Sequence, residues 1–269
     1  MKWWMAIGCI VLLLATGVAC AAGTGETTRH FDIVSTSTVS SNSYDLGILL
    51  ERCYYEVNSI WGSAPDHIKV ILVGKKSMDQ VGEHVEAFSA WNKDSSSIVL
   101  RQDSLKNKNA LKVAAEHEIC HICINPFIAK KECKNFNWME EGICMVVSKE
   151  PFDDAKVSKS IVKYGFMSPA EIASAVDNDN YNVSKNGYLQ SYSLIKYIDT
   201  RYGVDAIVQM IESPEKSVEA AFGDATGEDF STFYAEWASY VRMKAISPSG
   251  QSRVPSSGYR PASRPAYAF

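Results

Sequence analysis

Apolar residues recur at helical spacing over much of the chain. The stretch YDLGILLERCYYEVNSIW, residues 44–61, predicts a helix that Gly62 ends. Ser168, followed by Pro169, has the pattern of an N-cap and a first helical residue. Further helices are predicted over residues 110–124, 138–148, 188–202 and 229–245.

Two short runs have the β-branched character of strands. They are IKVILVG, residues 68–74, and SSIVLRQ, residues 96–102, while FDIVST near residue 31 could form a third. The segment between the first two runs, residues 75–95, is predicted to be a short helix and a loop. Because the strands come first and helices dominate afterwards, the prediction is an α+β fold, mainly helical, with a small mixed β-sheet.

The two ends of the chain differ from the middle. Residues 1–22 have Lys2, an apolar run and small residues at the end, which is the layout of a secretory signal peptide. Cys20 also fits a lipoprotein signal, in which it would carry a lipid anchor. Residues 23–43 are predicted to be a Ser/Thr-rich lead-in, residues 44–246 one domain, and residues 247–269 a disordered tail rich in Pro, Ser, Gly and Arg. The expected location is therefore extracytoplasmic.

Composition and charge exclude few classes of function. The chain is 46% hydrophobic and 22% charged, as in ordinary folded proteins, and its net charge is -4. This charge argues against a basic footprint for nucleic acid.

The stretch AAEHEICHICINPF carries the chemistry. HEICH fits the pattern H-E-x-x-H, and on a helix His117 and His121 lie one turn apart on the same face. Two imidazoles so placed can bind one zinc ion, and Glu118 lies beside them without occupying a ligand position. The helix should end near Asn125, because Pro126 disfavours helical geometry in the residue before it.

A catalytic zinc site needs a third protein ligand. The segment NFNWMEEGICMVV offers Glu140 and Glu141, which would point about 100° apart on a helix, so only one of them can face the metal. Nineteen residues separate His121 from Glu141, enough for a turn and a second helix.

The cysteines allow a rival interpretation. The chain has seven, of which Cys9 leaves with the leader. A structural zinc cluster of His117 to Cys123 with Cys133 and Cys144 is disfavoured, because Cys123 would lie about 160° from His121 around the helix. Cys120 and Cys123 are expected to be buried thiols or to form disulfides. Cys133 with Cys144, or Cys123 with either, are the pairings considered. His30, His67 and His84 are predicted to be surface or loop residues.

HEICH followed by WMEEG resembles the gluzincin metallopeptidases, and the chain is similar to peptidase MA-like domains of bacterial secreted proteins. Their W-x-x-E-G segment implies Glu141 as the third zinc ligand. Their Y-x-Q-S-x-S-L helix corresponds to YLQSYSLIKYIDTRYG here. It suggests Tyr188, with Tyr192 as the competitor, as the donor to the developing oxyanion. Glu140 and Cys144 depart from the family pattern, which has Asn and commonly Ala there.

The resemblance implies a zincin-like fold and metal-assisted hydrolysis of a peptide or protein substrate. Zn2+ would activate a water, and Glu118 would take its proton and pass it to the leaving amine. A strand such as residues 96–102 could pair with the extended substrate by edge addition. The alternatives are a catalytically silent, zinc-containing binding protein of the cell envelope and a non-catalytic envelope module held by disulfides.

Overall fold

A computed structural model describes residues 25–35, 43–81, 85–131 and 134–247. The predicted signal segment and nearly all of the predicted tail lie outside these residues, as do Cys20, His84 and Cys133. The chain forms two compact units, Met1–Asn125 and Pro126–Phe269. None of the described helices is both long enough and apolar enough to cross a membrane.

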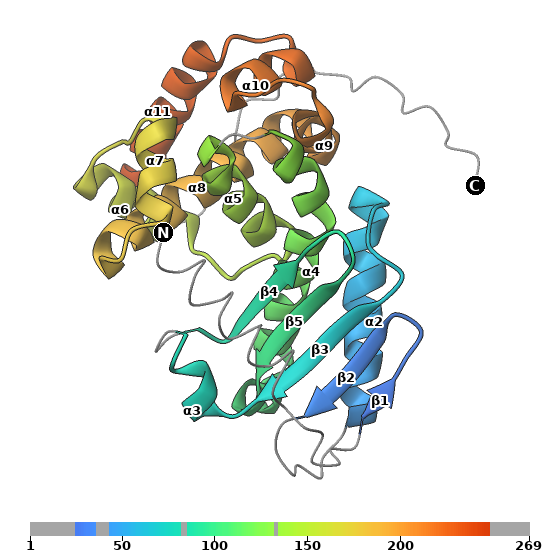
Figure 1. Ribbon diagram of the computed structural model, residues 1–269. Helices are drawn as coiled ribbons and strands as arrows, with labels where there is room; N and C mark the ends of the chain where they lie inside the picture. The colour runs from blue at the N-terminus through green and yellow to red at the C-terminus, as the bar shows by residue number, and fades with distance from the viewer. Residues whose placement is uncertain (1–24, 36–42, 82–84, 132–133, 248–269) are drawn as a thin grey trace. The chain divides into compact units, whose positions relative to one another are not determined.

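The first unit contains a mixed sheet of five strands (Figure 1). The order across the sheet is β1-β2-β3-β5-β4. The pairs β2/β3 and β3/β5 are parallel, whereas β1/β2 and β4/β5 are antiparallel. The strands span Glu26–Thr27 (β1), Phe31–Ser35 (β2), Ile68–Val73 (β3), Ala87–Trp91 (β4) and Ser96–Arg101 (β5).

Strand register explains which residues face the helices of this unit. Phe31 pairs with Ile68, and Val70 pairs with Ile98, so these side chains lie on one face of the sheet and are fully buried. Helix α2 (Ser43–Trp61) covers this face, because its Tyr54 ring lies 6.0 Å from the Phe31 ring, edge to face. The opposite face has a smaller apolar cluster that includes Val73, Phe88 and Val99 from β3, β4 and β5, and Met78 from α3 (Lys75–Met78).

Strand β4 was not predicted, and it corrects the expected substrate edge. Only Phe88 is buried among its five residues, so the segment shows too little apolar alternation to be recognised as a strand. Because β5 pairs with β3 on one side and β4 on the other, β5 offers no free edge. The expectation that residues 96–102 pair with a substrate is therefore wrong, and β4 is the edge strand at this end of the described sheet.

Helix α4 (Lys108–Ile128) carries the HEICH motif and continues beyond the predicted end. Pro126 lies inside its last turn, where it removes one backbone donor but leaves the preceding turns intact. Ile122 and Ile124 are fully buried, which favours a continuous helix up to that point. A short 3₁₀ turn, Ala129–Lys131, follows. The prediction that the helix stops near Asn125 is wrong by about one turn.

The described part of the second unit is helical. Its helices are α5 (Asn137–Val147), α6 (Asp154–Tyr164), α7 (Pro169–Val176), α8 (Tyr181–Tyr202), α9 (Val204–Glu212), α10 (Val218–Thr226) and α11 (Phe230–Ile246). The predicted cap is confirmed: Ser168 and Glu171 form a capping box at the start of α7, with Pro169 in the first turn. Gly203 ends α8 with a φ of 81°, a conformation that favours glycine.

Three helices of this unit were not predicted, and one begins earlier than expected. The missed helices are α6, α9 and α10, whereas α8 starts at Tyr181 rather than Tyr188. Its first turns contain residues of low helix propensity, but Asn180 caps them by accepting from the backbone N–H groups of Asn182 and Val183. The α+β class, mainly helical with a small mixed sheet, is confirmed.

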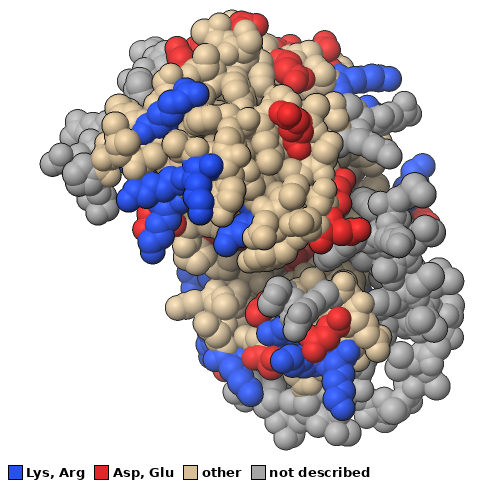
Figure 2. All heavy atoms as spheres, turned by 90° about the vertical axis from the view of Figure 1, so that its left-hand side faces the viewer, with Lys and Arg blue, Asp and Glu red and all other residues tan. Residues whose placement is uncertain are grey.

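Charges of both signs occur on the face drawn in Figure 2, where uncharged side chains cover much of the surface between them. Several exposed ion pairs are short-range contacts within one helix, such as Arg52 with Glu56 at 2.8 Å. Such pairs contribute little to stability because water and salt screen them.

Candidate metal centre

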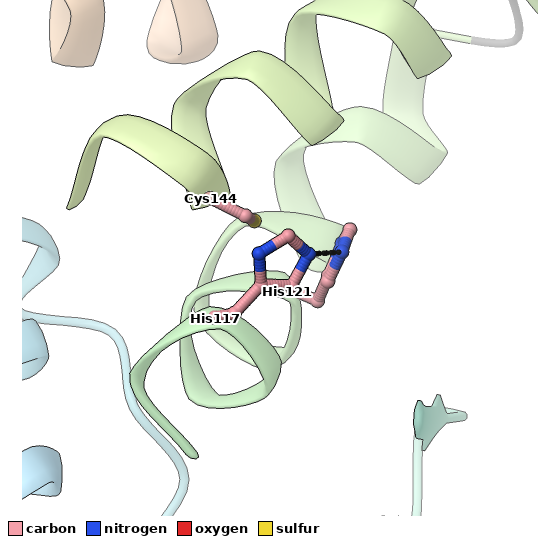
Figure 3. A group of neighbouring side chains, drawn as sticks. All are labelled: His117, His121 and Cys144. Atoms are coloured by element: carbon pink, nitrogen blue, oxygen red, sulfur yellow. Dashed lines mark hydrogen bonds between the residues drawn. The ribbon is translucent and has the colours of Figure 1, made fainter. Parts of the chain in front are cut away.

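Helix α4 presents the two motif histidines to each other (Figure 3). The Nε2 atoms of His117 and His121 lie 3.1 Å apart, and the ring centroids are 4.9 Å apart. Both side chains are half-buried. The sequence-based expectation that one helical turn would bring two imidazole nitrogens together is therefore confirmed.

The distance between the histidine nitrogens fits a shared metal ion. Two nitrogen ligands at about 2.0–2.1 Å from a tetrahedral zinc lie about 3.3 Å apart, close to the 3.1 Å found for His117 and His121. The same distance also suits a hydrogen bond in which one neutral imidazole donates to the other. The donor set is thus of the right type for zinc, and half-burial leaves the pair accessible.

One further ligand type belongs to this group. His117, His121 and Cys144 each offer one ligand atom, and these atoms all lie within 4.8 Å of one another (Figure 3). Above, a zinc cluster that joins the histidines with Cys144 was disfavoured, and Cys144 was otherwise treated as a departure from the family pattern or as a disulfide partner, so its closeness to the two histidines was not expected. Its spacing was the available signal, because residues three apart on α5, such as Glu141 and Cys144, share a helix face.

Glu118 has the burial expected of a proton acceptor in a closed site. Its side chain is only 8% exposed. Within the part of the chain that the structure describes, no hydrogen bond or ion pair engages its carboxylate. A carboxylate that no structural bond engages is available as a proton acceptor beside the two histidines.

Helix α5 carries both candidates for the third ligand. Glu140 and Glu141 are half-buried in its first turns, and the preceding Trp138 is fully buried, as expected of a packing anchor. Gly142 lies where α5 approaches α8 closely. A Cβ atom at Gly142 would meet the backbone oxygen of Ser191 at 2.6 Å. The glycine of the W-x-x-E-G segment therefore has a packing role next to Glu141.

An ion cluster on another face of α4 attaches this helix to α2. Lys112 donates to Glu56 at 2.8 Å and also contacts Glu116. The hydrogen bond from Lys112 is the main cause that lowers the pKa of Glu56 to about 2, whereas burial raises the pKa of Glu116. Glu116 and His117 are neighbours in sequence but point about 100° apart. The cluster thus fixes the rotation of α4 with its histidines directed elsewhere.

The two tyrosines considered as oxyanion donors differ in their surroundings. Tyr192 is 7% exposed, donates its hydroxyl to Asp154 at 3.1 Å and packs on the Phe152 ring at 4.6 Å. Burial, assisted by Asp154, raises the pKa of Tyr192. Its hydroxyl is committed to this structural bond. Tyr188, one turn earlier on α8, is half-buried and remains the candidate.

The other polar residues of the α8 motif have structural partners. Gln190 is fully buried, accepts from the backbone N–H of Met167 at 3.0 Å and donates to the carbonyl of Gly165 at 3.0 Å. Ser193 accepts from the indole N–H of Trp237 at 3.0 Å. In the Y-x-Q-S-x-S-L pattern, Gln190 therefore holds the segment between α6 and α7 against α8. Ser193 holds α11 against α8.

The structure tests part of the prediction about the disulfide state of the cysteines. Cys53, Cys120 and Cys123 are buried thiols that form no disulfide, so a pairing through Cys123 is wrong and the buried-thiol alternative is confirmed. Burial is the main cause that raises the pKa of Cys53 to about 12, so this thiol stays protonated. Cys144 is also buried, and Cys133 lies outside the described residues.

His30 was predicted to be a surface or loop residue: it does lie in the loop between β1 and β2, but its side chain is buried rather than at the surface. Its side chain stacks on the Tyr54 ring at 3.9 Å, and its Nδ1 lies 2.7 Å from Glu51. Burial alone would raise the pKa of Glu51, but hydrogen bonds from Thr28 and His30 outweigh it and lower the pKa. Charge and stacking partners 21 or more residues away in sequence explain the burial. His67 is exposed, as predicted.

Comparison with known proteins adds no family assignment: no family model matches the chain, and no curated protein matches it.

Proposed function

We propose that this protein is an extracytoplasmic zinc-dependent peptidase in which His117 and His121 bind the metal and Glu118 is the general base. The observation that carries the proposal is the 3.1 Å separation of the two Nε2 atoms on α4, with the buried carboxylate of Glu118 next to them in the helix. The resemblance of HEICH and WMEEG to the gluzincins supports Glu141 as the third ligand.

Different residues of the chain have different roles in the proposed hydrolysis. Bound zinc would polarise the scissile carbonyl and lower the pKa of the attacking water. Glu118 accepts the proton of that water and delivers it to the leaving amine. Tyr188 donates its hydroxyl to the oxygen on which negative charge develops. Retention of Glu118 favours an enzyme over a silent zinc-containing binding protein, which would need the ligands but not the base.

Substrate binding is assigned to the edge of the sheet. Strand β4 pairs with β5 on one side only among the described strands, which leaves its other backbone edge available to an extended peptide. Addition of a strand there would bind peptide backbone largely independently of side-chain identity. This assignment replaces β5, whose two edges are both paired.

Elemental analysis of the purified protein tests the metal. We expect about one zinc per chain, and loss of most of it on His117→Ala, because a catalytic zinc site needs three protein ligands and only two would remain. His67→Ala is the matched control, since His67 is 61% exposed and lies near Asp32 rather than α4 partners. If zinc is absent from the native protein even after resupply, or persists in His117→Ala, the proposed function fails.

Three substitutions on α5 identify the third ligand. Glu141→Ala should weaken zinc binding by more than the roughly 10- to 100-fold that follows loss of a group that only orients a ligand, because a ligand itself is removed. Competition with a chromogenic chelator measures the affinity. Glu140→Ala should retain most of the affinity. Cys144→Ala tests whether the thiol is the third ligand. If zinc affinity falls only in this variant, the third ligand is Cys144 rather than Glu141.

Tyr188→Phe should lower kcat by about 10- to 100-fold while KM, zinc content and the thermal unfolding midpoint change little, because only a donor to the transition state is removed. Tyr192→Phe is the comparison: it removes the bond to Asp154 and should lower stability more than kcat. An unchanged kcat in Tyr188→Phe would leave Tyr188 as a packing residue.

A further inference from the structure

The helical unit contains a cavity that the proposed metal centre does not use. Its volume is about 260 Å³, and helices α6, α8 and α11 line it. From α8, Tyr197 and Lys196 face the cavity, and from α11, Tyr240 and Lys244 do so one turn apart. Asp154, in the first turn of α6, lies at its wall. Three helices thus direct charged and aromatic groups into one space.

The cavity carries more basic than acidic charge. Lys196 lies 3.3 Å from Asp199, so its charge is partly compensated. For Lys244, no acidic partner within ion-pair distance occurs among residues 25–35, 43–81, 85–131 and 134–247. The only acidic residue in the lining, Asp154, already accepts a hydrogen bond from Tyr192 at 3.1 Å. An anion between the two ammonium groups would therefore be favoured.

Aromatic surface forms another wall. The rings of Tyr197 and Tyr240 lie 5.0 Å apart, inclined by 30°, and both residues line the cavity. Tyr197 is only 3% exposed and also packs on the Phe233 ring, so the half-buried Tyr240 offers the accessible ring surface. Burial is the main cause that raises the pKa of both tyrosines, so their hydroxyls stay protonated at neutral pH. A planar or apolar body can pack on such rings, while a protonated hydroxyl can donate to an oxygen.

We propose that this cavity binds a small organic anion, with its carboxylate or phosphate between Lys196 and Lys244 and its ring against Tyr240. The volume is below the roughly 300–1,000 Å³ of pockets for drug-sized ligands, so the ligand is the size of a single ring or amino acid. This site is separate from the proposed zinc chemistry and holds whether or not the protein is a peptidase.

Calorimetric titration of the full chain with benzoate, phenyl phosphate, inorganic phosphate and benzamide tests the proposal. Benzoate or phenyl phosphate should bind in the millimolar range or tighter, and the tighter of the two identifies the anionic group. Inorganic phosphate and uncharged benzamide should each bind at least about tenfold more weakly, because one lacks the ring and the other the charge. Equal affinities for phosphate and phenyl phosphate would contradict the proposed packing of the ligand's ring on the aromatic side chains.

Substitutions then place the ligand in the cavity. Lys244→Gln should weaken binding of the preferred anion about 10- to 100-fold, the range of a charge-assisted hydrogen bond. Lys163→Gln is the control, because Lys163 is on α6, which also lines the cavity, but lies over the Tyr164 ring and is not a lining residue. Circular dichroism checks that each variant folds. Absence of binding for every probe, or unchanged affinity in both Lys244→Gln and Lys196→Gln, would refute the site.

Discussion

Glu118→Gln should lower the rate of peptide hydrolysis by about 10²–10⁴-fold, the usual contribution of a general base, while zinc content stays at the native level. The reason is chemical: glutamine keeps the size of the side chain but cannot accept a proton. The side chain is 8% exposed and has no partner among the described residues, so the substitution breaks no recorded structural bond.

The measurement uses a library of quenched fluorescent peptides, with zinc determined on the same samples. Glu219→Gln, an identical change at an exposed position of α10, is the control and should be fully active. Native activity in Glu118→Gln would rule out the base. If the native protein binds zinc but cleaves no peptide or unfolded protein, the silent binding protein of the envelope becomes the better interpretation.

Gly142→Ala should destabilise the protein by about 1–3 kcal/mol, the cost of an atom forced into a packed interior. The added Cβ would meet the Ser191 backbone oxygen at 2.6 Å and Ile195 Cγ1 at 2.6 Å. A backbone atom cannot rotate away, so α5 and α8 must separate. In a chain of this size the unfolding midpoint should fall by about 2–4 °C for each kcal/mol.

Unfolding of the metal-free protein, followed by circular dichroism in a chelator, isolates this packing effect from zinc binding. Gly223→Ala is the matched control in α10, where the nearest atom to a Cβ would be the Glu228 oxygen at 3.6 Å. That variant should be as stable as the native protein or up to about 1 kcal/mol more stable, because alanine favours helix. Equal effects at the two glycines would show that α5 and α8 do not constrain Gly142.

Gly142→Ala also bears on the metal centre. Glu141 precedes Gly142 on α5, so a shift of this helix moves the proposed third ligand. A loss of zinc affinity in Gly142→Ala that exceeds the loss in Glu140→Ala would link the packing of α5 and α8 to the site.

The motif on α8 predicted the helix correctly but did not indicate which of its polar residues have structural partners. The pattern Y-x-Q-S-x-S-L predicted a helix, and α8 is one. The partners of Gln190 and Ser193, at Gly165, Met167 and Trp237, are 23 to 44 residues away. No local spacing reveals such contacts, so the motif alone could not separate structural from catalytic positions.

The sequence by itself determined the helical class and the pairing of His117 with His121, because both follow from the local 3.6-residue period of a helix. The tertiary structure alone decided that β4 is the edge strand of the described sheet and that His30 is buried against Glu51 and Tyr54. It also decided that α6, α8 and α11 together line one cavity. These features depend on contacts between residues far apart in the chain, and hydrophobic periodicity carries no information about which distant surfaces meet.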